Sequence, residues 1–256
     1  GTRGTVHYLG FGAYTGNYGA GASRLGHMGS LDGSDLKIDD DGRFEVVLSQ
    51  REQSGNWIPL LPERGTLVIR QFHLDREAEE PAGIRIERIG AEDRPEPLSA
   101  ASLAHGLAGT NLFVDGVVRR FTGKVDEWAK RPNTLEPDPA MGTGAWGDPN
   151  QIFRHGYWTL EPGQMLVISF IPPPCFYWNF QLDNRWMESL DYRFHPVTVN
   201  GHSAVTESDG TVQIVVADVD PGFGNWMSTC GHRHGAMGLR WNQAERDVQP
   251  TCEVRP

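Results

Sequence analysis

The residues best suited to chemistry lie in one short loop near the end of the chain. Residues 227–234 have the sequence Met-Ser-Thr-Cys-Gly-His-Arg-His, with His232 and His234 separated by one residue. An imidazole titrates near neutral pH and can act as general acid, general base or metal ligand. In an extended segment both imidazoles would lie on the same side of the chain. The loop predicts an acid/base pair or two ligands, although a solvated loop with two incidental histidines is the alternative.

Two carboxylates precede this loop and are candidate partners for the histidines. Asp218 and Asp220 stand before Pro221-Gly222, so one could orient a histidine and the other could bind a metal or a substrate hydroxyl. We assign Asp220 to the catalytic group, with an ordinary turn aspartate as the alternative. Cys230 could be a nucleophile beside His232, but a small buried cysteine is the simpler interpretation. No metal ligand set is assigned, and the cofactor stays unknown.

Arginine and aromatic side chains supply candidate substrate contacts. An arginine could neutralise a substrate anion. In a strand over residues 176–182, alternation places Trp178 on one face, which is core by default, and Tyr177 with Asn179 on the other. An aromatic wall with a few polar groups suits a sugar or another ring-shaped small molecule. The predicted substrate-binding residues are Arg240, Arg193, Trp178, Tyr177, Trp158 and Trp146.

These candidates stand out because the chain carries one pattern twice. The loop between the second Trp and the next strand contains both histidines, whereas the equivalent loop in the first copy, residues 58–64, has none. The pattern indicates an ancient duplication in which shared features are architectural. Asp-Gly predicts a tight turn, and Gly-Asn-Trp predicts a turn that buries the Trp. The matching segments are Asp41–Leu48, Gly55–Trp57 and Gly65–Arg70 in the first copy, and Asp209–Val216, Gly224–Trp226 and Gly235–Arg240 in the second.

The composition favours a mainly β fold. With 31 glycines and 17 prolines in 256 residues, the chain suits a turn-rich β architecture. We expect two jelly-roll-like β-sandwich halves, residues 1–90 and 160–256, joined by a helical and Pro/Gly-rich connection over residues 91–159. Helix is expected over residues 99–120 and 125–130. The expected strands are residues 6–11, 36–38, 44–48, 66–72 and 84–89, then 165–171, 176–182, 198–200, 212–217 and 236–241.

Charge and termini limit the classes of partner. The net charge of −10 argues against a nucleic-acid surface and against anionic membranes, and no apolar run is long enough to span a membrane. Three cysteines, an odd number, argue against a disulfide framework, with a single bridge as the alternative. The chain begins without a methionine or signal peptide, so we expect an N-terminal portion of the same protein to be missing. Localisation, cytoplasmic or periplasmic for a soluble protein, stays open, and a homo-oligomer is possible.

Several segments of the second half resemble a known family. They are Tyr157–Leu160, Pro172–Trp178, Trp186–Tyr192 and Asp220–Trp226. Together they are similar to a bacterial family of unknown function, "domain of unknown function twelve-fourteen", which often accompanies a sister domain of unknown function. The resemblance implies that this chain is the C-terminal β-rich part, that a helical portion precedes Gly1, and that the fold is a pair of jelly-roll-like sandwiches. It implies no activity.

Two functional hypotheses follow, from different classes. The first is a hydrolase or lyase that acts on a polar or carbohydrate-like small molecule, with His232 and His234 transferring protons and an arginine holding the substrate's charge. The second is a non-catalytic glycan-binding, small-molecule-binding or assembly module of a larger protein. The concentration of titratable groups beside aromatic residues favours the enzyme.

Overall fold

The computed structural model describes residues 1–20, 26–62, 65–90, 97–143 and 147–256. The protein is mainly β, with 37% strand and 14% helix arranged with several sheets. The long helix α1 (Ala100–Trp128) contains the division between two units, Gly1–Val117 and Val118–Pro256. Within the described ranges, no helix combines the length and the apolar character needed to cross a lipid bilayer.

Unit 1, residues 1–117, has one antiparallel sheet and one parallel pair of strands. The sheet has the order β2-β1-β5, and β3 pairs with β4. Leu9 and Phe11 of β1 pack with Phe44 and with Ile58 of β4 in a shared core, so the two sheets face one another. The elements are β1 (Tyr8–Thr15), the 3-10 helix η1 (Tyr18–Ala20), β2 (Gly26–Asp32), β3 (Val46–Ser49), β4 (Asn56–Pro59) and β5 (Gly65–Phe72).

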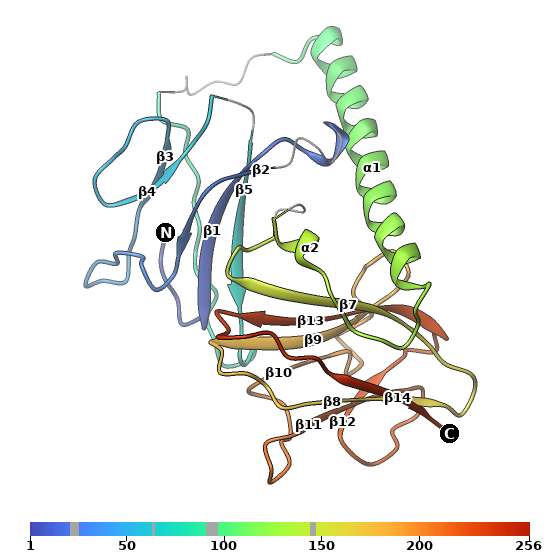
Figure 1. Ribbon diagram of the computed structural model, residues 1–256. Coiled ribbons are helices and arrows are strands. Elements are labelled where there is room, and N and C mark those ends of the chain that lie inside the picture. The colour runs from blue at the N-terminus through green and yellow to red at the C-terminus, as the bar shows by residue number, and fades with distance from the viewer. Residues whose placement is uncertain (21–25, 63–64, 91–96, 144–146) are drawn as a thin grey trace. The chain divides into compact units, whose positions relative to one another are not determined.

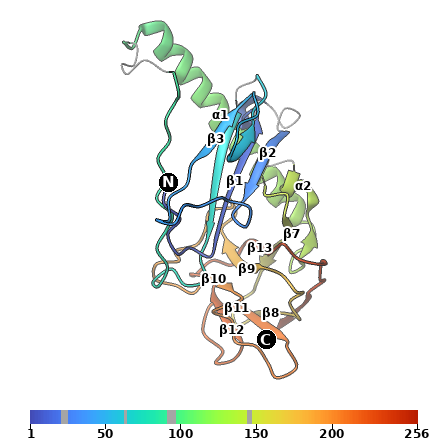
Figure 2. The ribbon, with the colours of Figure 1, turned by 90° about the vertical axis from the view of Figure 1, so that its left-hand side faces the viewer.

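Unit 2, residues 118–256, is a two-layered β-structure (Figure 1). One sheet has the order β10-β9-β13-β7-β6 and the other β12-β11-β8-β14. Trp158 and Trp241 of the first sheet pack with Ile168 and Ile214 of the second in one core, because each strand turns alternate apolar side chains inward. Figure 2 shows β8 and β11 in a layer separate from β9 and β13. The elements are β6 (Glu136–Pro137), α2 (Pro139–Thr143), β7 (Gln151–Thr159), β8 (Met165–Phe170), β9 (Tyr177–Asp183), β10 (Thr198–Asn200), β11 (Val212–Ala217), β12 (Asn225–Ser228), β13 (His234–Asn242) and β14 (Thr251–Arg255).

The expected Asp-Gly turns are present in both units. Gly42 has φ of 78° and Gly210 has φ of 87°, a left-handed conformation that glycine adopts without strain. In each turn the aspartate accepts a hydrogen bond from the amide two residues later, Asp41 from Arg43 and Asp209 from Thr211. The turn prediction is confirmed.

The Gly-Asn-Trp elements bury their asparagine more deeply than their tryptophan. Asn56 and Asn225 are each 8% exposed, whereas Trp57 and Trp226 are half-buried. Each asparagine begins a short strand, β4 or β12, that pairs in parallel with the preceding strand. The expectation of a buried tryptophan is wrong because alternation turns the asparagine inward, where its amide binds backbone groups.

Several element boundaries differ from those expected. The first expected strand, residues 6–11, is β1 and continues to Thr15, and β2 begins at Gly26, where no strand was expected. Residues 36–38 and 84–89 form no strand. The helix is one piece that continues through Gly116, where an added Cβ would collide with the carbonyl oxygen of Tyr18. Residues 151–159, placed in the connection by the sequence, form the nine-residue strand β7.

Candidate active site

Strands β7, β13 and β9 separate a core face from a second face, which we call the polar face. Trp241 of β13 lies opposite Trp178 of β9, and both side chains belong to the core. Residues one position along each strand turn the other way, so the predicted alternation of Tyr177 and Trp178 is confirmed. The polar face carries His155 and Tyr157 of β7, Arg240 and Asn242 of β13, and Asn179, Gln181 and Asp183 of β9.

His155 lies on the polar face, enclosed by two aromatic side chains and a glycine. It is 2% exposed. The indole of Trp128, the last residue of α1, stacks on the imidazole with 4.7 Å between ring centroids and 9° between ring planes. The ring of Phe153 is also nearly parallel to the imidazole, with 5.9 Å between ring centroids and 13° between ring planes. On the neighbouring strand β13, Gly238 lies directly opposite His155. Burial lowers the pKa of His155, more than the nearby Asp138 raises it, so the imidazole is neutral at pH 7.

Asp138 is the carboxylate partner of this histidine. Its backbone amide donates to the carbonyl oxygen of Phe153 at 2.8 Å, which holds it beside β7. Its Oδ2 lies 3.5 Å from Nδ1 of His155, and its Oδ1 lies 3.4 Å from Nζ of Lys124. At 3.5 Å the contact is longer than an ordinary N–H···O hydrogen bond, and both this contact and the charge of Asp138 act to raise the pKa of His155. Burial alone would raise the pKa of Asp138, but His155 and Lys124 together lower it.

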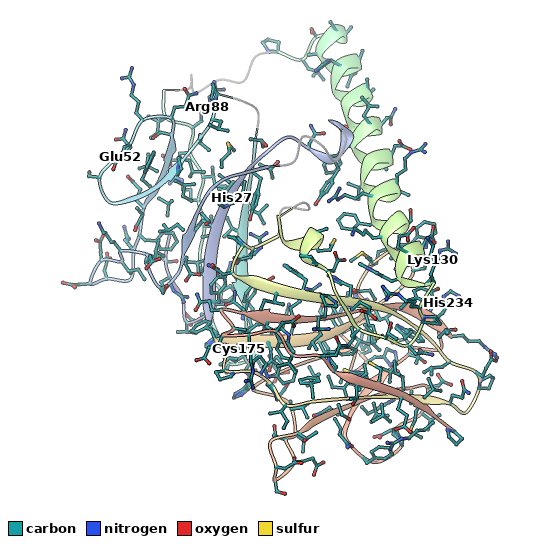
Figure 3. All side chains as sticks on the ribbon, viewed as in Figure 1. His27, Glu52, Arg88, Lys130, Cys175 and His234 are labelled. Carbon is teal, nitrogen blue, oxygen red and sulfur yellow. The ribbon has the colours of Figure 1, made fainter. Side chains whose placement is uncertain are left out.

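A cavity of about 360 Å³ lies beside the His155–Asp138 pair. α1 contributes Lys124 and Trp128 to its lining, while β6 and the chain after it contribute Glu136 and Asp138. In Lys130, which Figure 3 labels, Nζ lies 2.7 Å from Oε1 of Glu127. Each cation of the lining, Lys124, Lys130 and Arg131, has a carboxylate within 4 Å. The balanced charges suit a polar ligand with several hydrogen-bonding groups.

A second carboxylate, Asp183, is buried on the polar face. It is 3% exposed and accepts a hydrogen bond from Nε2 of Gln181 at 2.5 Å. Burial raises its pKa, and the hydrogen bond from Gln181 and the charges of Arg240 and His155 offset only part of this rise. The titrations of His155 and Asp183 are therefore coupled to each other and to the charge of Arg240 on a single face of the sheet.

This arrangement can perform acid/base chemistry. A neutral imidazole with a carboxylate beside Nδ1 favours the tautomer that carries its proton on Nδ1. Nε2 is then a free base. A carboxylate beside Nδ1 also stabilises the imidazolium that forms when Nε2 takes a proton. Among the described residues, no group of three or more histidine, cysteine, aspartate or glutamate side chains is arranged to hold a metal ion.

The two histidines predicted to be catalytic lie at the surface of unit 2. His232 is exposed in a turn that includes Cys230 with φ of 52°, so the segment is not extended and the same-side argument does not hold. His234 begins β13, and its Nδ1 lies 2.7 Å from the hydroxyl oxygen of Tyr157 (Figure 3). Asp220 is exposed and accepts the amide hydrogen of Gly222. No contact of Asp220 with either histidine occurs among the described residues.

The predicted substrate-binding residues divide into three groups. Arg240 and Tyr177 lie on strands β13 and β9 and are half-buried. Arg193 is exposed and paired with Asp191, with 3.0 Å between Nε and Oδ1. Trp158 and Trp178 are 0% and 6% exposed within the core, so neither can contact a ligand while the core is intact. Trp146 lies outside the described residues.

The cysteines show no sign of activation. All three are free thiols. Burial raises the pKa of Cys230, and a hydrogen bond with Ser228 offsets part of the rise. A nucleophilic cysteine needs a lowered pKa, because the thiolate is the reactive form. Cys230 was interpreted as a small buried cysteine; it is half-buried, and the direction of its pKa does not favour a nucleophilic role.

The sequence reasoning missed His155 and Asp138. Residues 151–159 contain aromatic residues in alternation, with Phe153, His155 and Tyr157 on one face, and this pattern could have identified the strand. Asp138 follows Pro137 in a stretch rich in proline and glycine, and no local pattern marks it. The pairing of β6 with β7 brings the two residues together.

Comparisons with other proteins show which family and fold the chain resembles, but they give no activity. Residues 18–74 match the model of a family described as protein of unknown function (DUF1214). These residues lie in unit 1, whereas the segments that carried the resemblance in the sequence lie in unit 2. The VPA0106 protein from Vibrio parahaemolyticus is 9% identical, with a TM-score of 0.50 over 97% of this chain and 82% of that chain, so it shows the fold alone. The comparison with curated proteins gives no match.

A much closer similarity defines the family. The crystal structure of an uncharacterized protein from Burkholderia cenocepacia is 40% identical in sequence, with a TM-score of 0.95. The match covers 100% of this chain and 71% of that chain. The chain therefore belongs to the same family as this Burkholderia cenocepacia protein.

Proposed function

We propose that unit 2 is an enzyme of hydrolase or lyase type that transfers protons to and from a polar or carbohydrate-like small molecule. The observation that carries this proposal is the buried, neutral His155 beside the ionised Asp138, at the edge of a cavity. His155 is the acid/base group, with Nε2 accepting the proton. Asp138 holds the tautomer and stabilises the charged imidazole. This moves the acid/base role from His232 and His234 to the polar face.

The composition of the cavity supports the class of ligand. Trp128 offers an aromatic surface, and Glu127, Glu136 and Asp138 offer carboxylate oxygens that can accept hydrogen bonds from hydroxyl groups. Lys124, Lys130 and Arg131 offer donors. Mixed aromatic, acceptor and donor groups are typical of sites that bind sugars and related polar molecules.

The experiment compares an extract of metabolites and oligosaccharides before and after treatment with the protein, by mass spectrometry. The wild-type protein should consume at least one compound, and His155→Gln should not consume it. His232→Gln/His234→Gln is the matched control and should retain activity. Loss of turnover in the control, together with full activity in His155→Gln, would return the catalytic role to the loop histidines.

A second candidate function is a non-catalytic glycan-binding, small-molecule-binding or assembly module. One observation favours it: both ring nitrogens of His155 are buried and lack solvent contact, with Trp128 lying over the ring. If a compound copurifies with wild-type and His155→Gln protein alike, and none is consumed, this function replaces the enzymatic one.

The fold also carries a proposal. We infer that the two units arose by duplication of a jelly-roll-like sandwich, with α1 as the helical linker. In support, each unit has a parallel strand pair, β3–β4 or β11–β12, that begins at equivalent positions after an Asp-Gly turn. Residues 4–11 and 163–170 are also weakly similar in sequence, but β1 pairs with β5 whereas β8 pairs with β11 and β14, so this similarity adds no support.

A further inference from the structure

The polar face collects buried polar atoms that have no hydrogen-bond partner. Eight such side-chain atoms occur in the described part of the chain. Three of them belong to two residues of the polar face, Nε2 of His155 and the amide oxygen and nitrogen of Asn242, whereas Nδ1 of His155 and Oδ2 of Asp138 lie 3.5 Å from each other. A buried polar atom without a partner is costly, so atoms of this kind gathered on one face indicate a ligand that supplies the missing bonds.

Gly238 lies beside two groups that could bind such a ligand. A Cβ atom added to Gly238 would lie 3.5 Å from Nε2 of His155 and 3.7 Å from Nη2 of Arg240. A base and a guanidinium group therefore approach the same small patch of backbone. Glycine keeps this patch free of a side chain. Within the described ranges, Arg240 has no carboxylate within ion-pair distance, unlike Arg193 and Arg154.

Asn242 lies on the same face of β13 as Gly238 and Arg240, and these three residues form a row along the strand. Asn242 lies two positions beyond Arg240 on β13, which corresponds to about 7 Å along a strand. Its side chain is 1% exposed, with both amide atoms unpartnered. An amide can donate to one hydroxyl group and accept from another. The row therefore presents an anion-binding group beside a group suited to hydroxyls.

We propose that the patch over Gly238 binds the carboxylate of a small hydroxylated acid, such as a sugar acid, through Arg240, while Asn242 binds its hydroxyl groups. This inference rests on the proposed function, because it names the substrate class for the same His155. The guanidinium group presents paired N–H donors that match a carboxylate. Neutral sugars lack this group and bind less tightly.

A carboxylate bound in this subsite would determine which proton of the ligand His155 removes. Nε2 of His155 accepts the proton from the carbon next to the bound carboxylate. The electron pair of that C–H bond moves onto the carboxylate, giving an enediolate whose added charge Arg240 neutralises. Departure of an oxygen leaving group from the next carbon then yields a carbon–carbon double bond, with the proton held on His155 available to the leaving oxygen. No oxidant or reductant is needed.

The test measures binding by calorimetry with D-gluconate, D-glucuronate and D-glucose as probes. At least one acid should bind the wild-type protein, and D-glucose should bind at least about tenfold more weakly. Arg240→Gln should weaken binding of the acid by about tenfold or more, because a charge-assisted pair is lost. Arg193→Gln is the matched control and should bind as the wild type does, since Arg193 is engaged with Asp191 at the surface.

A second variant tests whether the space next to Gly238 is needed for binding of the acid. Gly238→Ala places a methyl group 3.3 Å from Cδ2 of His155, where it fills the patch, and should abolish binding of the acid. Gly109→Ala is its control, because nothing lies within 4 Å of a Cβ added there. Circular dichroism confirms that both variants are folded. If Gly238→Ala does not fold, Arg240→Gln decides the question alone.

The outcomes separate this inference from the proposed function. Equal binding of the acid to wild-type and Arg240→Gln protein, no preference over D-glucose, or no binding of either acid would overturn the carboxylate subsite. Turnover of another compound that depends on His155 would in that case leave the proposed function standing. Conversely, acid binding that depends on Arg240 without any turnover would support the subsite and remove the enzymatic function.

Discussion

Trp128 and His155 form a parallel stack in which the last residue of α1 covers an imidazole on the central strands of unit 2. The ring centroids are 4.7 Å apart. Burial is the largest cause of the lowered pKa of His155. The stack therefore has a measurable electrostatic consequence, because removing the indole exposes the imidazole to water.

Trp128→Ala should raise the pKa of His155 towards its unperturbed value of 6.5. The physical reason is that water stabilises the charged imidazole once the indole is removed. An NMR titration of the histidine side chains measures the change. Trp186→Ala, which removes an exposed indole, is the control and should leave the pKa of His155 unchanged. An unaltered His155 pKa in Trp128→Ala would show that burial by Trp128 is not the cause.

The stability of the protein should fall as the pH drops below about 6.5. The pKa of His155 is lower in the folded state than in the unfolded state, so the unfolded chain takes up a proton first. This contribution is full above the unfolded pKa and is lost as the pH falls towards the folded pKa. Each unit of difference in pKa is worth about 1.4 kcal/mol.

Urea unfolding at about pH 7.5 and about pH 5.5 measures this dependence. His155→Gln should show a smaller loss of stability over the same interval. Asp138, whose pKa is also lowered, contributes to a loss only at more acidic pH, near its unfolded value of 3.8. An equal loss in wild-type and His155→Gln protein would assign the dependence to other groups.

Asp183→Asn should stabilise the protein at neutral pH. Burial raises the pKa of Asp183, so the folded state disfavours the ionised form that the unfolded chain carries at neutral pH. An asparagine removes this cost and can still accept the hydrogen bond from Gln181. A gain of about 1 kcal/mol corresponds to about 2–4 °C in Tm for a protein of this size.

Thermal unfolding measures this gain, which should shrink at acidic pH as the wild-type carboxylate becomes protonated. Asp220→Asn is the control, because Asp220 is exposed in a turn, and its Tm should match that of the wild type. A lower Tm for Asp183→Asn would mean that its charge is needed to balance Arg240.

Asn56→Ala and Asn225→Ala should each destabilise the fold by about 2–4 kcal/mol, since both leave buried backbone groups unpaired. Asn56 accepts a hydrogen bond from the Lys37 amide and donates to the carbonyls of Lys37 and Glu45. Asn225 makes the same three bonds with the amide and carbonyl of Val205 and the carbonyl of Gln213.

Denaturant unfolding measures both losses. Asn111→Ala, at an exposed position of α1, is the control and should change stability by less than about 0.5 kcal/mol. Losses below about 1 kcal/mol for the two buried asparagines would show that water replaces their bonds.

Some strands of the two cores were predictable because their apolar side chains are continuous and β-branched. The expected residues 198–200 and 212–217 coincide with β10 and β11. Strand β7 escaped prediction because Arg154, His155 and Gly156 interrupt its apolar pattern. The contacts of this buried histidine come from other parts of the chain, so the local sequence does not reveal them.

The candidate site depends on contacts that no local motif encodes. His155 meets Asp138 through the pairing of β6 with β7, and meets Trp128 through the end of α1. The prediction of Arg240 as an anion-binding residue came from its place at the end of a repeated segment, and it remains a prediction. The histidine pair of residues 232 and 234 has a conspicuous spacing, but its turn conformation is set by Cys230 and Gly231, both with positive φ.

The most direct measurement is the depletion of compounds from a metabolite and oligosaccharide extract by wild-type, His155→Gln, Asp138→Asn and His232→Gln/His234→Gln proteins, each shown to be folded. We predict a compound that the wild type and the double variant consume, that Asp138→Asn consumes more slowly, and that His155→Gln leaves untouched. Consumption of that compound by His155→Gln at the wild-type rate would contradict the assignment of His155 as the acid/base group.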